Sequence, residues 1–422
     1  AHADARPGPW QTRRRSASRS VLIPTPDEAL DGLAELGDPT RMFTKPFVFV
    51  TSATLALVIY IGVMVPLLPR LIEEQFGGNE IDIGLNLAVF SIAAIMIRPR
   101  LGRFAEKHGL RATMVGGAML AAVATAACTF IDSRWGLLPL RCLQGIGEAF
   151  LFVGAATSIS DLAPPGRGAE AASYFSVAVF GGLGIGPVIS ESVIGKDRFD
   201  AGLWVAAGCA ALAAALATLT PKGVRHHNEG EERGPRFYRA AVPTGLVLAL
   251  GVGGLVTFSA FMPDYSVTVG LDGSKWVFAT YAGVCLLIRV VAATVPDRIG
   301  HARAVSIAMT LTGVGLTMLF LWPRPIGVFI STVIVGIGIS FNYPSLMAMT
   351  VGAIPEREKV RAISTFTMFF EIGTATGALI FGTLADLTTK RTAFLGGAGF
   401  CFIGLIVLWK VAVPRTQQYV AV

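Results

Sequence analysis

Three ionisable side chains lie in stretches of sequence that are otherwise apolar. Glu371 is flanked by several uncharged residues on each side, and Arg141 and Glu148 share another apolar stretch. Charged groups in such surroundings are costly unless they are paired, and they mark ion or substrate pathways. A carboxyl group that gains and loses a proton there suits a proton-coupled process. The alternative for Glu371 is a neutral acid that is permanently bonded to a neighbouring helix.

Arg141 and Glu148 are seven residues apart, so on a helix they lie two turns apart on one face. They could line one cavity, but they are too far apart for a direct ion pair. Proton coupling or substrate binding is one interpretation of this pair. In the structural alternative, Arg141 bonds backbone carbonyls and Gln144 only to hold helices together.

Other chemistries lack their residues in this sequence. The five cysteines form no Cys-x-x-Cys pair, and no Ser/His/Asp or Cys/His set can be assembled within the apolar stretches. No Gly-x-x-x-x-Gly-Lys-Ser/Thr loop supports ATP use. We therefore expect no enzymatic activity, no metal site and no cofactor. The net charge of +7 does not indicate nucleic-acid binding, because the basic residues lie in short connections between apolar runs.

Long apolar helices must position the ionisable residues. The 422 residues are 53% hydrophobic and 15% charged, with a mean hydropathy of +0.62. In lipid, segments of spanning length satisfy their own backbone hydrogen bonds as helices. We predict an all-α membrane protein with twelve transmembrane helices, at residues 46–69, 82–102, 111–131, 136–160, 168–192, 200–220, 241–264, 274–296, 302–321, 325–351, 360–385 and 391–414.

A constant shift of 191 residues relates the two halves of the chain. It places Arg98 onto Arg289 and Gly109 onto Gly300. The same shift also relates Glu106, Gly145, Gly147, Pro164, Gly182 and Gly186 to Asp297, Gly336, Gly338, Pro355, Gly373 and Gly377. Two parallel six-helix repeats in a pseudo-twofold arrangement are the architecture of a rocking transporter with its site between the repeats.

The polar segments divide the chain at the same places. We expect an N-terminal six-helix half at 46–220 and a C-terminal six-helix half at 241–414, joined by a charged cytosolic linker at 221–240. Residues 1–45 and 415–422 are expected to be cytosolic tails, the first of them disordered. An organelle transit peptide fits the first tail less well, because acidic residues soon follow its arginines.

The basic residues also fix an orientation. With both termini in the cytoplasm, the inner segments carry 25 of the 35 lysines and arginines when Arg98 and Arg100 are counted with their loop. The outer loops carry 8, and Arg141 and Arg289 lie within spans. The positive-inside rule therefore predicts a multi-pass protein of a cell membrane, which we expect to be a bacterial inner membrane, with cytoplasmic termini.

A basic segment with a fixed glycine spacing follows the second predicted helix. Gly102 permits close helix approach, Gly109 permits a left-handed turn, and Glu106 could lie at the positive N-terminus of a neighbouring helix. The alternative is a positive-inside loop without further function. The segment resembles the signature of the major facilitator superfamily between its second and third helices, Gly-x-Leu-Ala-Asp-Arg-x-Gly-Arg-Arg, with Glu106 in place of the aspartate.

That resemblance implies a fold of two six-helix halves and a latch that holds the cytoplasmic face closed in the outward-open state. In the family, the acidic residue acts against the start of helix 11, a role that would fall to Glu106. The latch residues implied for this chain, including their repeat counterparts, are Gly102, Arg103, Glu106, Gly109, Arg111, Asp297 and Arg298. The segment from Arg141 to Gly147 is similar to the family pattern Arg-x-x-Gln-Gly-x-Gly.

A glycine-rich stretch in the fifth predicted helix resembles the exporter motif of proton-coupled antiporters. Gly182, Gly186 and Pro187 match its Gly-x-x-x-Gly-Pro core, whereas Ser190 and Glu191 stand where the family has a glycine pair. The alternative is ordinary close packing of helices through small residues.

Aromatic and amide side chains offer a candidate substrate cavity. Tyr343 precedes Pro344, which interrupts the tenth helix, and this region is expected either to contact substrate or only to form a kink. The candidate cavity residues are Gln144, Phe258, Asn342, Tyr343 and Phe370.

Together these features predict a secondary active transporter. We expect a proton-coupled exporter of small amphipathic drugs or metabolites that works by alternating access, with Glu371, Glu148 and Arg141 in proton coupling. The alternatives are a proton-coupled importer and a non-transporting membrane sensor. The expected partners are the small solute, protons and the lipid bilayer, and we expect a monomer that binds no nucleic acid.

Overall fold

The chain forms a bundle of long α-helices without strands in the part that the computed structural model describes, residues 42–164, 167–194, 198–221, 238–292, 294–352 and 359–415. The N-terminal half contains α2 (Lys45–Arg70), α3 (Glu80–His108), α4 (Leu110–Ala127), α5 (Arg134–Leu162), α6 (Gly168–Ile194) and α7 (Phe199–Thr218). The C-terminal half contains α8 (Val242–Thr268), α9 (Lys275–Val291), α10 (Val295–Ile299), α11 (His301–Leu321), α12 (Pro325–Gly352), α13 (Lys359–Leu387) and α14 (Lys390–Val407).

Short helical pieces complete these elements. A π-helical turn, η1 (Leu71–Gln75), continues α2, and another, η5 (Leu408–Ala412), continues α14. The 3-10 turns η2 (Cys128–Phe130) and η3 (Arg239–Ala241) flank α4 and α8. The expected linker and both expected tails lie almost wholly outside the described residues.

The number and length of the helices fit a membrane-spanning bundle. Eleven helices in the described ranges are long and apolar enough to cross a bilayer. The twelfth long helix is α9, whose 17 residues lie at the lower limit for spanning. The predicted helix 274–296 is therefore too long. Its last turn is replaced by the separate helix α10, because Pro296 near the start of α10 cannot donate a backbone hydrogen bond to a continuing helix.

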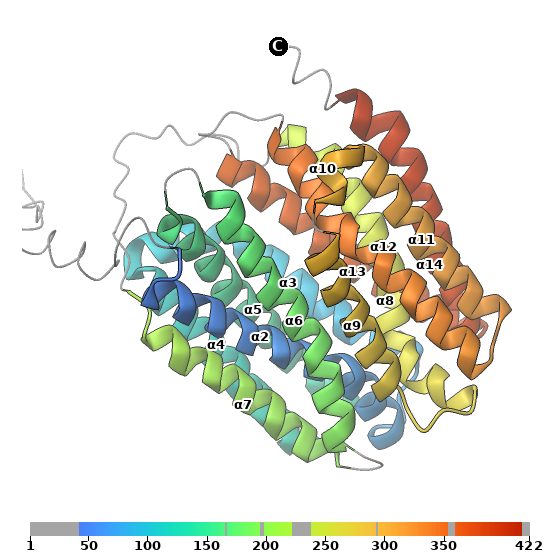
Figure 1. Ribbon diagram of the computed structural model, residues 1–422. Coiled ribbons are helices and arrows are strands. Elements are labelled where there is room, and N and C mark those ends of the chain that lie inside the picture. The colour runs from blue at the N-terminus through green and yellow to red at the C-terminus, as the bar shows by residue number, and fades with distance from the viewer. Residues whose placement is uncertain are drawn as a thin grey trace, which may run out of the picture.

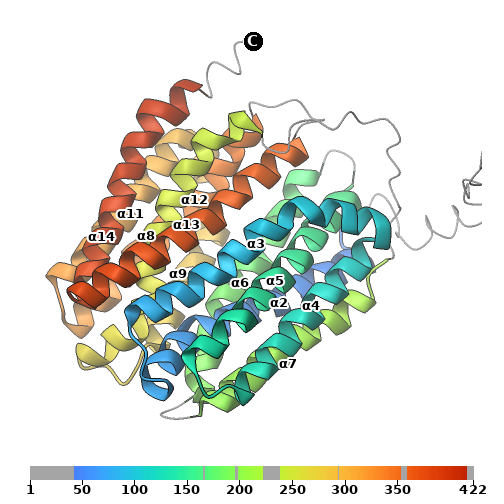
Figure 2. The same ribbon diagram turned by 180° about the vertical axis from the view of Figure 1, so that it is seen from behind.

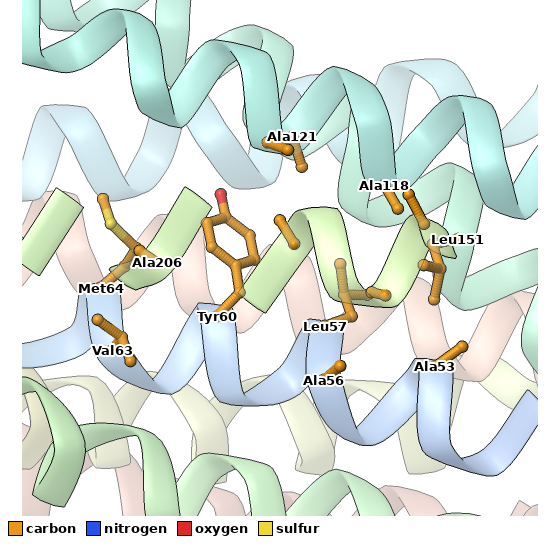
Figure 3. Packing of buried hydrophobic residues seen from close by; sticks show 14 of the residues in the cluster. Ala53, Ala56, Leu57, Tyr60, Val63, Met64, Ala118, Ala121, Leu151 and Ala206 are labelled. Atoms are coloured by element: carbon orange, nitrogen blue, oxygen red, sulfur yellow. The ribbon is translucent and has the colours of Figure 1, made fainter. Parts of the chain in front are cut away.

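The helices of each half lie together, and the two halves lie side by side (Figures 1 and 2). Within the N-terminal half, α2 packs against α6 and α7, and α4 packs against α5 and α7. Small residues permit this close packing. Figure 3 shows Leu57 and Tyr60 of α2 in a buried cluster with Ala118 and Ala121 of α4 and Ala206 of α7.

The most extensive contacts between the halves are those of α3 with α13 and of α6 with α9, and α2 also contacts α8. Glycine backbones touch at the first of these contacts. A Cβ atom added at Gly84 would lie 2.4 Å from the carbonyl oxygen of Ala378, and one added at Gly382 would lie 2.7 Å from that of Glu80. These contacts lie near the start of α3 and the end of α13, at the end of the bundle that the charge pattern predicts to face outward. We call this end the outer end.

Ion pairs tie the two halves together at the outer end. The Nζ atom of Lys390, at the start of α14, lies 2.8 Å from a carboxyl oxygen of Glu73 and 3.3 Å from one of Glu80. It also pairs with Asp264 of its own half. The hydroxyl of Ser274, just before α9, donates to Glu191 of α6 over 2.8 Å. Both interfaces are thus closed at the outer end.

Candidate functional site

An ion pair joins the two halves inside the bundle. Nη2 of Arg98, on α3, lies 3.5 Å from Oε1 of Glu371, on α13. Nη1 of the same arginine donates to the hydroxyl of Thr367 over 3.2 Å, one helical turn before Glu371. The side chains of Arg98 and Glu371 are only 9% and 8% exposed. A buried guanidinium and carboxylate are costly separately, so each stabilises the other in this position.

A second carboxyl group faces the same pair. Glu148 of α5 is buried, and it lies within electrostatic range of both Glu371 and Arg98. Its Oε2 atom has no hydrogen-bond partner among the described residues. Three helices from both halves therefore place one ion pair and a second buried carboxyl group within electrostatic range of one another. We call Arg98, Glu148 and Glu371 the carboxyl cluster.

Arg141 lies outside the carboxyl cluster. Its Nη1 donates to Gln144 over 2.6 Å, its Nε donates to the carbonyl oxygen of Asn86 over 3.4 Å, and its guanidinium lies 4.6 Å from the centre of the Phe90 ring. Gln144 in turn donates to the sulfur of Cys128. These contacts are those of the structural alternative, in which Arg141 and Gln144 hold α3, α4 and α5 together. The cation of the carboxyl cluster is Arg98, and the predicted role of Arg141 in proton coupling stays a prediction.

The candidate cavity residues separate into two groups. Gln144, Phe258 and Asn342 are buried within single halves; Phe258 packs on Phe278 and Tyr281, and Asn342 reaches Gly251 of α8. Phe370 is 38% exposed. Tyr343 is the residue of this set that faces the other half, because it lies within electrostatic range of both Arg98 and Arg289.

The 191-residue shift could have located Arg98. Sequence reasoning counted Arg98 with a cytoplasmic loop, although its repeat counterpart Arg289 was placed within a span. The structure shows Arg98 within the apolar part of α3, which continues to His108. Equivalent positions of two repeats lie at equivalent depths, so the depth of Arg289 was the available signal.

The geometry agrees with the comparison with known families. The Major Facilitator Superfamily model matches residues 49–275 and 272–420. The chain belongs to the Major Facilitator Superfamily. It is 26% identical over 389 residues to an uncharacterized MFS-type transporter of Salmonella typhimurium strain LT2, covering 87% of this chain and 97% of the relative. An uncharacterized MFS-type transporter of Burkholderia mallei strain SAVP1 is 27% identical over 373 residues, covering 84% and 89%.

Solved structures of facilitators share the fold. The peptide transporter POT in complex with alafosfalin superposes with a TM-score of 0.75 at 14% identity, covering 92% of this chain and 99% of that one. The nucleoside transporter NupG gives a TM-score of 0.70 at 13% identity, covering 86% and 98%. The predicted fold of twelve helices in two repeats is confirmed, and the chain is a multi-pass membrane transporter.

The facilitator signature at the end of α3 and the start of α4 is described only in part. Gly109 has a φ angle of 87°, and its repeat counterpart Gly300 has 90°, so both hold the left-handed turn expected of glycine. Asp297 and Arg298 of α10 are exposed, and Asp297 lies 3.7 Å from His301. Arg111 is partly buried. The side chains of Gly102, Arg103 and Glu106 lie outside the described residues, as does the expected partner at the start of α13.

Gly182 and Gly186 of α6 pack inside the N-terminal half, whereas Gly184 between them meets Ala282 of α9. A Cβ atom at Gly186 would lie 2.6 Å from Cα of Gly62 on α2, and one at Gly182 would lie 2.9 Å from the backbone nitrogen of Ile59. Pro187 also contacts the site of Gly62, since its Cδ would lie 3.1 Å from a Cβ there. This contact is the helix packing that small residues allow, and it fixes the face of α6 that meets α9.

Proposed function

We propose that this facilitator is a proton-coupled exporter of small amphipathic solutes that works by alternating access. The observation that carries the proposal is the carboxyl cluster, in which Glu371 pairs with Arg98 between the two halves and the buried Glu148 lies within electrostatic range of both. With both carboxyl groups ionised, the cluster would hold an uncompensated negative charge in a buried place. One proton neutralises it, so proton binding and the state of the inter-half ion pair are linked.

The linkage supplies a coupling step. A proton on Glu371 removes the charge that attracts Arg98, so α3 and α13 separate more easily. Loss of the proton restores the ion pair between Arg98 and Glu371. It therefore favours the conformation in which α3 and α13 are held together at the carboxyl cluster. Transfer of the proton between Glu371 and Glu148 would pass it between the two halves, and a change in which side of the membrane the cluster faces would then carry it across.

Export is the proposed direction because Gly182, Gly186 and Pro187 keep the core of the exporter pattern, and their packing on α2 supports a rigid α6 at the interface with α9. The import of a solute together with protons would use the same carboxyl cluster. We further propose that both termini lie in the cytoplasm, on the side of α10 and η5, which occupy one end of the bundle (Figure 1).

The experiment is a transport screen in an efflux-deficient host, followed by reconstitution into liposomes with the solute that it identifies. We expect Glu371→Gln and Glu148→Gln to abolish flux driven by a pH gradient while solute-for-solute exchange continues. The matched control is Glu74→Gln, because Glu74 lies at the exposed outer end and pairs with Arg70 over 2.9 Å. Undiminished gradient-driven flux in both cluster variants would refute the coupling. Accumulation only when the gradient is reversed would establish import.

A further inference from the structure

A second guanidinium lies, partly buried, at the other interface between the halves. The guanidinium carbon of Arg289, on α9, lies 3.6 Å from the centre of the Phe180 ring on α6. Its Nε and Nη2 atoms are buried without a hydrogen-bond partner, and no described acidic residue pairs with it. Burying a charge in this way is unfavourable unless a counter-ion completes the site at some stage of the cycle.

The two nitrogen atoms of Arg289 that lack hydrogen-bond partners among the described residues lie on the same edge of its guanidinium group. Nε and Nη2 carry parallel N–H groups on one side of the guanidinium plane, and this edge matches the two oxygens of a carboxylate or phosphate. The Phe180 ring lies against the guanidinium and cannot accept the hydrogen bonds of this edge in its plane, so Nε and Nη2 stay buried without partners in the described ranges. The unsatisfied donors are thus arranged for an oxyanion.

Comparison of the two repeats, as far as the structure describes them, shows that Arg289 lacks the carboxylate partner that Arg98 has. A shift of 191 residues relates Arg98 to Arg289 and also relates Phe180 to Glu371. Across one interface the arginine meets a carboxylate, and across the equivalent interface it meets a phenyl ring. The protein provides an internal anion for Arg98 and none for Arg289 in the part of the chain that the structure describes.

The surroundings of Arg289 are aromatic and include hydroxyl groups. Tyr343 of α12 lies within electrostatic range of both Arg289 and Arg98, and Tyr281 of α9 lies within range of Arg289. The centre of the Tyr281 ring lies 5.3 Å from that of Phe258, and the centre of the Tyr343 ring lies 5.6 Å from that of Phe366, both in tilted arrangements. A phenol can donate a further hydrogen bond to an oxyanion, while the rings accept an apolar body.

We propose that Arg289 binds the anionic group of the transported solute, a carboxylate or phosphate carried on an apolar or aromatic body. The inference rests on the proposed function, because it names the chemical class of the solute that the exporter moves. The solute supplies the counter-ion that Glu371 supplies on the opposite interface. Binding of the anion joins α6 and α9 through the solute, so the loaded and empty transporters differ at an interface that must change during alternating access.

The test measures binding rather than flux, with the purified protein in detergent. The probes are benzoate and phenyl phosphate, each compared with an uncharged counterpart, benzamide and phenol. We expect the anions to raise the apparent melting temperature in a saturable way and the uncharged compounds to have no such effect. Arg289→Gln should weaken anion binding about 10-fold or more, since bidentate bonds to a charged group are lost. Arg289→Lys keeps the charge but not the planar edge, so its affinity for the anions should lie between those of the native protein and Arg289→Gln.

The results separate this inference from the proposed function. Glu371→Gln should retain anion binding while losing proton-driven flux. Equal binding of anions and uncharged counterparts, no binding of either anion, or unchanged affinity in Arg289→Gln would each overturn the anion site. If anion binding depends on Arg289 but Glu371→Gln and Glu148→Gln keep full pH-driven flux, the anion site stands and the proton coupling falls.

Discussion

Glu371 and Phe180 occupy equivalent positions of the two repeats, and each contacts an arginine of the opposite half. Glu371 pairs with Arg98, and Phe180 stacks on Arg289, so that two equivalent interfaces carry an ion pair and a cation–π contact. The difference between Glu371 and Phe180 thereby makes two equivalent interfaces chemically different. In our proposals, the α3–α13 interface responds to protons, and the α6–α9 interface keeps an unpaired cation that the solute uses.

The first prediction concerns the internal ion pair. Arg98→Gln leaves Glu371 without its cation, and we expect a loss of stability of ~3–5 kcal/mol, as for other buried pairs that lose one member. The double variant with Arg98→Gln and Glu371→Gln removes both charges and should regain most of this loss. Thermal unfolding of the detergent-solubilised protein at a pH above neutrality measures the difference. A double variant less stable than Arg98→Gln would contradict the pairing.

A second prediction concerns the ion pairs at the outer end. Lys390→Gln removes contacts with Glu73 and Glu80 of the other half, and we expect the population of outward-open molecules to rise about tenfold, since a charged hydrogen bond is worth ~1.5–3 kcal/mol. Spin labels at the exposed positions Gln75 and Leu321, in a protein freed of its native cysteines, report the separation of the outer ends of the two halves.

The control for this experiment is another lysine at the same end. Lys275 lies 5.6 Å from the centre of the Trp276 ring, and no described acidic residue pairs with it. Lys275→Gln should leave the distance distribution unchanged. An identical shift in both variants would mean that the change reflects lost surface charge rather than the loss of a specific link between the halves.

The glycine contact between α3 and α13 gives a third prediction. Gly84→Ala places a Cβ atom 2.4 Å from the carbonyl oxygen of Ala378, so the two backbones must move apart. We expect a destabilisation of about 1–3 kcal/mol, as for other overpacked sites. Gly116→Ala is the matched control, because a Cβ atom there has no neighbour within 4 Å. Equal melting temperatures for the two variants would show that the outer interface is looser than described.

Much of this fold follows from local properties of the sequence. Spanning helices need only apolar length, and the left-handed turns at Gly109 and Gly300 need only glycine, so both were predictable. The partners of the buried charges were not. Whether Asn342 faces another helix of its own half or the other half depends on the rotation of α12, which hydropathy does not determine. Arg98 lies near the end of the predicted helix 82–102, where hydropathy does not separate a buried residue from a residue of the following loop, and only the depth of its repeat counterpart Arg289 indicates burial.

The fourth prediction uses the membrane potential to separate export from import. If the solute is an anion, its export moves negative charge outward, and the entry of the proton moves positive charge inward. Both steps of the exchange therefore make the inside more positive. Moving the anion and the proton inward together moves no net charge. A potential of 100 mV acts on each transferred charge with ~2.3 kcal/mol. We therefore expect an inside-negative potential, set with valinomycin and potassium in liposomes, to accelerate export of an anion that passes the binding test. Flux that is indifferent to the potential would support import with a proton.

The fifth prediction converts the second interface into a copy of the first. Phe180→Glu places a carboxyl group opposite Arg289, at the position equivalent to Glu371. If Arg289 binds the anionic group of the solute in the native protein, the new carboxylate should take the place of that anion. Benzoate should then no longer raise the melting temperature. The intrinsic melting temperature should rise, because Arg289 gains a buried partner.

Two neutral variants make this result specific. Phe180→Leu removes the ring without adding charge, and Phe180→Gln adds a polar group of nearly the same shape as glutamate. Both should retain anion binding within about threefold, because Arg289 keeps its free edge and loses only the cation–π contact, worth ~0.5–2 kcal/mol. If Phe180→Glu binds benzoate as the native protein does, Arg289 is not the residue that holds the anion. If Phe180→Gln abolishes binding as completely as Phe180→Glu, the effect comes from the shape of the site rather than from competition between two carboxylates for one guanidinium.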